Sequence, residues 1–204
     1  MDNNDNKKDV WKTYGIWAFW VGIAFFSVYP TCNWLTSQRE ITYPLYLELE
    51  LTIPFIPGFF WAYMSMYILF MFPPFFLNVQ QLKRLGKQLV FSTILSGILF
   101  LLVPTKLGFE RIAPDNPFYQ NLFNQLFNVD HPHNLVPSLH VIFSAIIVFA
   151  LLEGTKKNHT KILFILWLTV LCLSTLLVHQ HHLLDVISGL LIAVIFYKFY
   201  KNRG

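Results

Sequence analysis

The chain has 204 residues, of which 55% are hydrophobic, 18% aromatic and only 13% charged, and its formal net charge is +4. A soluble domain carries roughly 25% charged residues, so this composition excludes an ordinary soluble protein. Several apolar runs approach the roughly 20 residues that a helix needs to span the hydrocarbon. The sequence therefore predicts an all-α polytopic membrane protein.

Six apolar runs predict six transmembrane helices in one bundle. They lie at about 14–33, 53–76, 88–105, 137–152, 162–179 and 183–200, the second containing prolines and the fourth being short. The polar residues 1–12 come before the first run without a signal-peptide cleavage site, so this span is expected to remain in the mature protein. We find no internal repeat or linker and expect one membrane domain over residues 1–204, with residues 1–13 cytoplasmic.

Two longer polar segments separate the spans. In residues 34–52, the carboxylates of Glu48 and Glu50 are expected to form a solvated edge. In residues 106–136, the stretch from Phe118 to Phe127 has one apolar face, which predicts a short helix lying in the membrane interface. Four further residues are expected to cap or order the loop before the fourth span: Asp130, His131, His133 and Asn134. For His131 and His133 this structural role is at least as well supported as a catalytic role.

The basic residues predict the orientation, because Lys and Arg are enriched in short cytoplasmic loops. With the N-terminus inside, only Arg39, Lys106 and Arg111 fall outside. Twelve basic residues fall inside: Lys7, Lys8, Lys12, Lys83, Arg84, Lys87, Lys156, Lys157, Lys161, Lys198, Lys201 and Arg203. The positive net charge therefore indicates the orientation in the membrane and not a nucleic-acid-binding surface. Both termini are then cytoplasmic. In a bacterium the protein would lie in the inner membrane, and its outer face would meet the periplasm or exterior.

Ionisable residues at the edges of the apolar runs converge on the predicted outer face. Residues 137–140 (Pro-Ser-Leu-His) open the fourth span, residues 179–185 join the fifth and sixth spans, and Lys106 and Arg111 follow the third. Ionisable groups at membrane depth are costly and by default mark a functional site. Their shared face predicts one site within residues 106–189.

The spacing of these residues indicates phosphoryl transfer. His181 and Asp185 are four apart, on one helix face, so the carboxylate can fix the imidazole tautomer and raise its basicity. Such an imidazole is a nucleophile or a general base, with His140 as the complementary acid. Lys106 and Arg111 are cations that can bind phosphate. Ser138 adds a hydroxyl, and the backbone amides at the start of the fourth span add donors that favour an anion. The alternative is that the histidines are interfacial polar residues and the cations snorkelling side chains.

The same motifs resemble those of the type 2 phosphatidic acid phosphatase superfamily. Pro137-Ser138-Leu139-His140 resembles its second signature, and Ser174-Thr175 followed by His181 and Asp185 resembles its third. The longer run from Asp130 through Pro132 and Asn134 to His140 is similar to a subgroup that includes inositol phosphorylceramide synthases. The resemblance implies a six-helix membrane fold without metal or other cofactor. It implies a phosphohistidine on His181, orientation by Asp185, leaving-group protonation by His140 and phosphate contact by Ser138.

The sequence departs from the superfamily pattern at two places. The third signature usually has Ser-Arg where this chain has Ser174-Thr175, a loss that the synthase subgroup commonly shares. The first signature usually has Lys and Arg-Pro seven residues apart, whereas Lys106 and Arg111 are five apart and Pro114 comes three later. Arg111 is therefore a better candidate for phosphate binding than Lys106. Because three histidines occur in four positions, the register at His181 and His182 also stays open.

The sequence favours a membrane phosphatase that cleaves a lipid phosphate or diphosphate at the non-cytoplasmic surface. A phosphotransferase of the inositol phosphorylceramide synthase type is an alternative, because only the acceptor of the second step differs. Two other classes stay open: a metal-binding membrane transporter, since His140, His179, His181, His182 and Asp185 are acceptable ligands, and a non-catalytic membrane factor with a decayed site. The expected partners are the lipid substrate and membrane lipids, and no nucleic acid.

Overall fold

The computed structural model describes residues 3–129 and 132–202, and over this part of the chain the protein is all-α. Only an isolated bridge between Tyr43 and Thr105 departs from helix and loop there. Asp130 and His131, for which the sequence indicated a loop-ordering role, lie outside the described residues, as does Arg203. The predicted fold class is confirmed at this level.

Four of the helices are long and apolar enough to cross a membrane: α1 (Asn3–Ser37) through its Lys7–Ser37 portion, α5 (Val79–Leu102), α8 (Asn158–Leu177) and α9 (Leu183–Lys201). Large apolar side chains such as Phe26 and Leu191 are 74% and 59% exposed on these helices. Lipid can cover them, whereas a soluble protein rarely exposes so much contiguous apolar surface. Within the described residues the chain therefore has four long candidate spans of an integral membrane protein, whereas the other two predicted runs, 53–76 and 137–152, do not form helices of that length.

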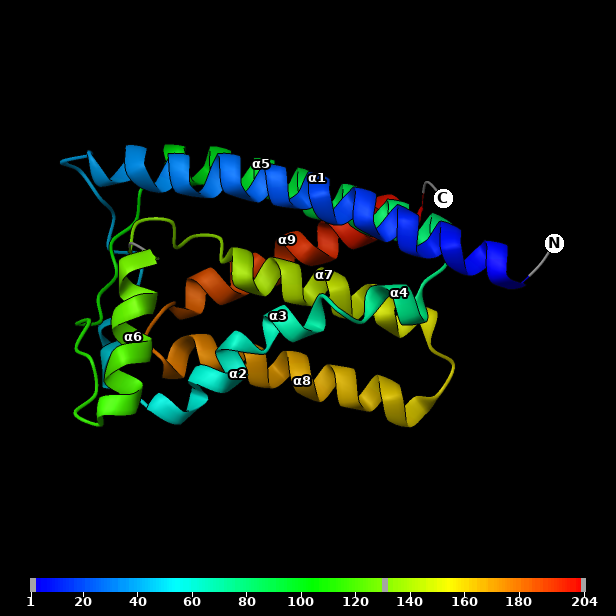
Figure 1. Ribbon diagram of the computed structural model, residues 1–204. Helices are drawn as coiled ribbons and strands as arrows, with labels where there is room; N and C mark the ends of the chain where they lie inside the picture. The colour runs from blue at the N-terminus through cyan, green and yellow to red at the C-terminus, as the bar shows by residue number, and fades with distance from the viewer. Residues whose placement is uncertain (1–2, 130–131, 203–204) are drawn as a thin grey trace.

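The second apolar run, 53–76, does not form one helix. It is divided into η2 (Pro57–Phe59), α2 (Phe60–Met64), α3 (Met66–Leu69) and α4 (Pro73–Phe76), which together run from one end of the bundle to the other (Figure 1). Proline lacks an amide donor and clashes with the preceding turn, so the two prolines that begin α4 prevent α3 from continuing. Broken backbone is tolerated at membrane depth where protein buries it.

Most residues of the central helix, α7 (Leu139–Gly154), are buried, because α3, α4, α5, α8 and α9 pack against it. At 16 residues it is shorter than the four long helices. Helices α1 and α5 lie against each other along their length, and glycines permit their close approach: a Cβ at Gly86 would lie 2.3 Å from the Trp17 ring, and one at Gly97 equally close to Val28. A larger residue at either position would force the helices apart.

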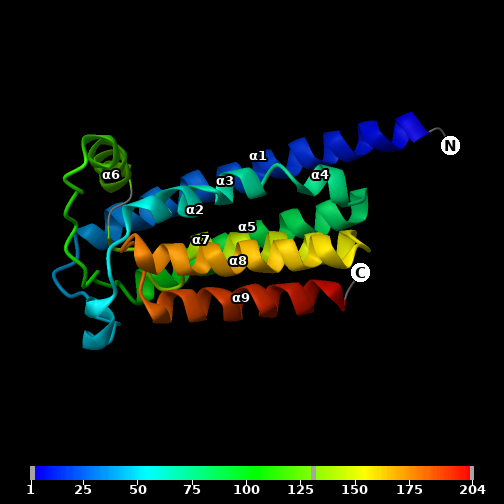
Figure 2. The same cartoon turned by 90° about the horizontal axis from the view of Figure 1, so that it is seen from below.

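The two ends of the bundle differ in character. Helix α6 (Pro117–Val129) lies across one end, and both chain termini lie near the other (Figures 1 and 2). The predicted short helix at 118–127 is thus present, and its fully buried Phe123 packs with Phe60 and Val178. At the opposite end, Lys83, Arg84 and Lys87 lie in the first turns of α5 rather than in a loop, and Arg84 forms an ion pair with Glu153 of α7.

Candidate active site

The turn between α8 and α9 brings His181 and Asp185 together. His181 Nδ1 lies 3.1 Å from Asp185 Oδ2, and the same oxygen accepts a 2.8 Å hydrogen bond from the backbone N–H of His182. The residues are only 6% and 1% exposed. The Asp185 carbonyl also accepts from the N–H of Ser138, at 3.1 Å, which joins the start of α7 to the start of α9. The expected pair is therefore formed, with its carboxylate held by two donors.

The conformation of this turn directs His181 away from α8. The backbone N–H groups of Gln180 and His181 both donate to the Thr175 carbonyl, at 3.0 and 3.1 Å. His179 adopts a φ of 54°, which is uncommon for a residue other than glycine. Its Nε2 lies 2.9 Å from the Ile53 carbonyl oxygen. The predicted Ser174-Thr175 motif thus supports the turn through its backbone, and the Thr175 hydroxyl bonds back to the Cys172 carbonyl.

His140 reaches the same place from the first turn of α7. Ser138 is the N-cap of this helix, and its fully buried hydroxyl accepts from the N–H of Val141 at 3.3 Å. The His140 ring stacks on Tyr63 with centroids 4.1 Å apart and hydrogen-bonds to the Tyr63 backbone. Its Nε2 is buried and has no hydrogen-bond partner among the described residues. A buried, unpaired polar atom is costly, and it belongs to a residue that lines the same cavity as His181.

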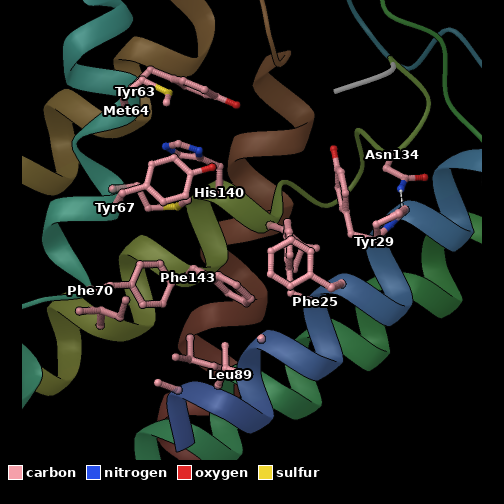
Figure 3. A pocket seen from close by; sticks show the side chains of 18 of the residues that line it. Phe25, Tyr29, Tyr63, Met64, Tyr67, Phe70, Leu89, Asn134, His140 and Phe143 are labelled. Atoms are coloured by element: carbon pink, nitrogen blue, oxygen red, sulfur yellow. Dashed lines mark hydrogen bonds between the residues drawn. The ribbon is translucent and has the colours of Figure 1, made fainter. Parts of the chain in front are cut away.

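That cavity has a volume of about 1120 Å³ and lies between α1, α2, α3, α5, α6 and α7. Its walls are mostly aromatic and aliphatic, and Figure 3 shows Phe25 and Tyr29 of α1 across from Tyr67 and Phe143. At the end near α6 the lining becomes polar, with His140, His181 and Asn134. Asn134 is fixed there, because its amide donates to the Tyr29 carbonyl at 2.9 Å and its oxygen accepts from Thr36.

The two predicted phosphate-binding cations are placed differently. The Arg111 guanidinium lies over the Phe127 ring of α6, 5.2 Å from its centroid, and Nη2 donates a long 3.5 Å hydrogen bond to Gln180 Oε1. Arg111 is thus held beside the residue that precedes His181. Lys106 is exposed, and its backbone N–H donates to the Tyr43 carbonyl. Neither cation lines the cavity. The geometry favours Arg111 over Lys106 as a phosphate ligand.

Glu50 is a site residue that the sequence analysis missed, and its predicted place on a solvated edge is wrong. It is 4% exposed, in η1 (Glu48–Thr52). Oε1 accepts from the N–H of Leu47 at 2.9 Å, while Oε2 accepts from the N–H of Leu183 at 2.7 Å and lies 3.2 Å from His182 Nδ1. Glu50 therefore holds the first residue of α9 from a loop more than 130 positions earlier in the chain. Its acidity within a Leu-rich stretch was the only available signal.

His182 is engaged through both ring nitrogens. Nε2 accepts from the N–H of Gly108 at 3.0 Å, so the proton lies on Nδ1 and is donated to Glu50. The ring is stacked between Phe109 and Tyr46, at 4.5 and 4.6 Å. Burial lowers the pKa of His182 below its ordinary 6.5, although the nearby carboxylates of Asp185 and Glu50 oppose the shift. A neutral ring is the form in which Nε2 can accept. The arrangement thus gives His182 a structural role and leaves His181 facing the cavity.

Removing the Glu50 charge is expected to destabilise this end of the bundle. In Glu50→Gln, an amide NH2 group replaces one carboxylate oxygen. It would then face an N–H group from which that oxygen accepts a hydrogen bond, and neither donor would have an acceptor. Leaving such a buried group unpaired costs about 1–3 kcal/mol, so we expect a lower melting temperature for the protein in detergent. Glu48→Gln is the matched control, because Glu48 is exposed in the same turn, and its effect should stay within about 0.5 kcal/mol. Equal melting temperatures for the two variants would contradict the role given to Glu50.

No group of three or more His, Cys, Asp or Glu side chains is placed to hold a metal ion within residues 3–129 and 132–202. The candidate ligands of a metal site are instead engaged separately. His179 bonds to Ile53, His182 to Glu50 and Gly108, and His181 to Asp185. The donor set therefore suits hydrogen bonding and proton transfer.

Fold and site together define an integral membrane protein with a buried histidine site at the end of an apolar cavity. Residues 85–203 match the PAP2 superfamily, and the chain belongs to this family. The matched region runs from within α5 to the end of α9 and contains all the predicted site residues. The match is to the superfamily and does not extend to the inositol phosphorylceramide synthase subgroup. No curated protein and no solved structure matches the chain.

Proposed function

We propose that this protein is a phosphatase for lipid phosphates or diphosphates that works through a phosphohistidine at the non-cytoplasmic face of the membrane. Membership of the PAP2 superfamily supports phosphatase-type chemistry on phosphate esters. One observation carries the specific proposal: the His181–Asp185 pair and the unpaired Nε2 of His140 meet at the polar end of a large apolar cavity. Phosphate chemistry and a lipid tail can both be accommodated there.

In the first step, His181 is the nucleophile. Asp185 accepts from Nδ1–H, which leaves the lone pair on Nε2 free to attack phosphorus. As the N–P bond forms, the bond from phosphorus to the leaving oxygen breaks. The protonated ring of His140 donates its Nε2 proton to that oxygen, and the negative charge of an entering phosphate favours this protonated form. The products are a free alcohol, or a shorter phosphate, and phospho-His181.

In the second step, His140 acts as the base. Water attacks the phosphohistidine, His140 removes the proton from that water, and inorganic phosphate leaves as His181 is restored. Ser138, the first amides of α7 and Arg111 bind the phosphate oxygens, since a helix N-terminus and a guanidinium both favour anions. Lys106 is assigned no direct contact, because it is exposed, whereas Arg111 is held at Gln180, next to His181.

A phosphotransferase shares the first step and differs only when an alcohol replaces water. An acceptor lipid would need room beside the leaving group, and the cavity provides a wide apolar space there. We place hydrolysis first because water needs no binding site of its own. The six-segment passage of the chain through the bilayer, with both termini in the cytoplasm, belongs to the same proposal and is supported by the passage of residues 57–76 along the bundle (Figure 1).

The experiment that tests this function measures phosphate release by purified protein in detergent. The substrates are phosphatidic acid, phosphatidylglycerol phosphate and undecaprenyl diphosphate, with and without a strong chelator. We expect release from at least one of them, resistance to the chelator, and inhibition by vanadate, which mimics five-coordinate phosphorus. Transfer to an added lipid alcohol in preference to water would favour the phosphotransferase. Loss of activity with chelator would favour a metal site, and no release from any of the substrates would indicate a decayed site.

A further inference from the structure

The apolar cavity extends along nearly the whole bundle. Every turn of α1 between Tyr14 and Ser37 contributes to its lining. At 1.5 Å per residue, this stretch of helix is about 35 Å long, and the hydrocarbon core of a bilayer is about 30 Å thick. The cavity is therefore about as long as the hydrocarbon core is thick, and it follows a helix that lies outside the family match.

The facing walls show the same extent. The polar end has His140 and His181, and the opposite end is lined by Pro73 at the start of α4 and Leu82 in the first turns of α5. The remaining lining is dominated by apolar side chains. Figure 3 follows it from His140 and Asn134 past Phe143 toward Leu89.

The length of the cavity determines which kind of lipid chain can fill it. The acyl chains of an ordinary phospholipid occupy one leaflet, which is about half of the 30 Å hydrocarbon thickness. Such a chain, with its phosphate at His181, would not reach the distant half of the cavity. Resting on the function proposed above, we propose that the substrate is a single-chain polyprenyl phosphate or diphosphate, whose chain is long enough to follow the cavity past the bilayer midplane.

Gly22 is positioned to test this length. It lines the cavity eleven residues from Asn33, a residue of α1 at the polar end, which is about 16 Å along the helix. A Cβ built at Gly22 meets nothing within 4 Å, so a larger side chain there enters open space inside the cavity. It would obstruct a chain that passes the midplane and leave room for a chain that ends before it.

The matched control is Gly15, on the same helix. A Cβ at Gly15 also meets nothing within 4 Å, and Gly15 does not line the cavity. Gly22→Phe and Gly15→Phe therefore add the same bulk to α1, and only the first adds it to the proposed chain site. Gly22→Leu is a smaller second variant for use if the melting temperature of Gly22→Phe shows that it does not fold.

The experiment compares kcat/KM for undecaprenyl phosphate, geranyl phosphate and phosphatidic acid in one detergent. We expect the wild type to prefer undecaprenyl phosphate. Because a side chain at Gly22 would remove several methylenes of the long chain from burial, we expect Gly22→Phe to lose about tenfold or more on the long chain. Geranyl phosphate turnover should stay unchanged, as should both activities of Gly15→Phe. An equal loss on both chains, or a wild type that prefers phosphatidic acid, would overturn the proposal.

A binding measurement separates this proposal from the function on which it rests. Native mass spectrometry records whether the protein retains undecaprenyl phosphate or geranyl phosphate. If no substrate is hydrolysed, the proposed function fails, while selective retention of the long chain by the wild type and its loss in Gly22→Phe would still support the chain site. Hydrolysis without any dependence on chain length would retain the function and reject the site.

Discussion

His181→Ala is expected to abolish phosphate release, whereas His182→Ala should retain a substantial fraction of it. His181 pairs with Asp185 and lines the cavity, while both ring nitrogens of His182 are engaged in hydrogen bonds between loops. Removing a nucleophile from a catalytic group that acts as a unit lowers kcat by about a thousandfold or more. The measurement is release of inorganic phosphate from the preferred lipid substrate, with both variants purified in the same detergent.

The covalent intermediate gives a second readout for the same pair of variants. With a substrate labelled in its phosphate, acid-labile and base-stable label should appear on the wild type and on His182→Ala and be absent from His181→Ala. His182→Ala should also melt at a lower temperature than the wild type, because it removes the partner of Glu50 and Gly108. Label that persists in His181→Ala and disappears in His182→Ala would shift the nucleophile by one residue and reject the proposed mechanism.

The sequence predicted those features that depend on local spacing. A separation of four residues at the start of a helix is enough to bring His181 and Asp185 together, whatever surrounds them. Apolar run length likewise predicted both ends of α8 and α9, and the C-terminal ends of α1 and α5, to within four residues. Helices α1 and α5 begin eleven and nine residues earlier than expected. Apolar run length failed at 53–76, where the apolar run forms several short helices and prolines begin two of them, η2 and α4. An apolar composition indicates that a segment is buried in protein or lipid. Whether the segment forms one continuous helix also depends on the positions of its prolines.

Features that depend on contacts between distant segments were not predictable in this way. Glu50 and His182 are 132 positions apart, and no local periodicity relates them. The cavity is another example, because an aromatic residue such as Phe25 has the same pattern whether it faces lipid, a neighbouring helix or an open space. The volume of the cavity depends on the distance between α1 and the layer formed by α2, α3 and α7. The sequence pattern of a single helix does not contain that distance. The different surroundings of Lys106 and Arg111 arise in the same way.

His140→Ala should lower activity by an amount that depends on the leaving group. His140 holds an unpaired Nε2 at the cavity, and a general acid of this kind contributes about 10²–10⁴ to the rate when the leaving group is a poor one. A lipid alkoxide is poor because its conjugate acid is weak, whereas a nitrophenolate leaves without a proton. We therefore expect a large loss on an alkyl lipid phosphate and a much smaller loss in the formation of phosphohistidine from a nitrophenyl phosphate ester.

The second step makes the comparison specific to proton transfer. If water attack also needs His140 as its base, His140→Ala should accumulate phosphohistidine with the nitrophenyl substrate, giving a burst of nitrophenolate followed by slow turnover. Tyr63→Leu is the control, since it removes the aromatic ring stacked on His140 and retains the imidazole and the backbone carbonyl. It should affect both substrates by similar factors. A loss in His140→Ala that is the same for alkyl and aryl substrates, without a burst, would mean that this imidazole shapes the cavity and moves no proton.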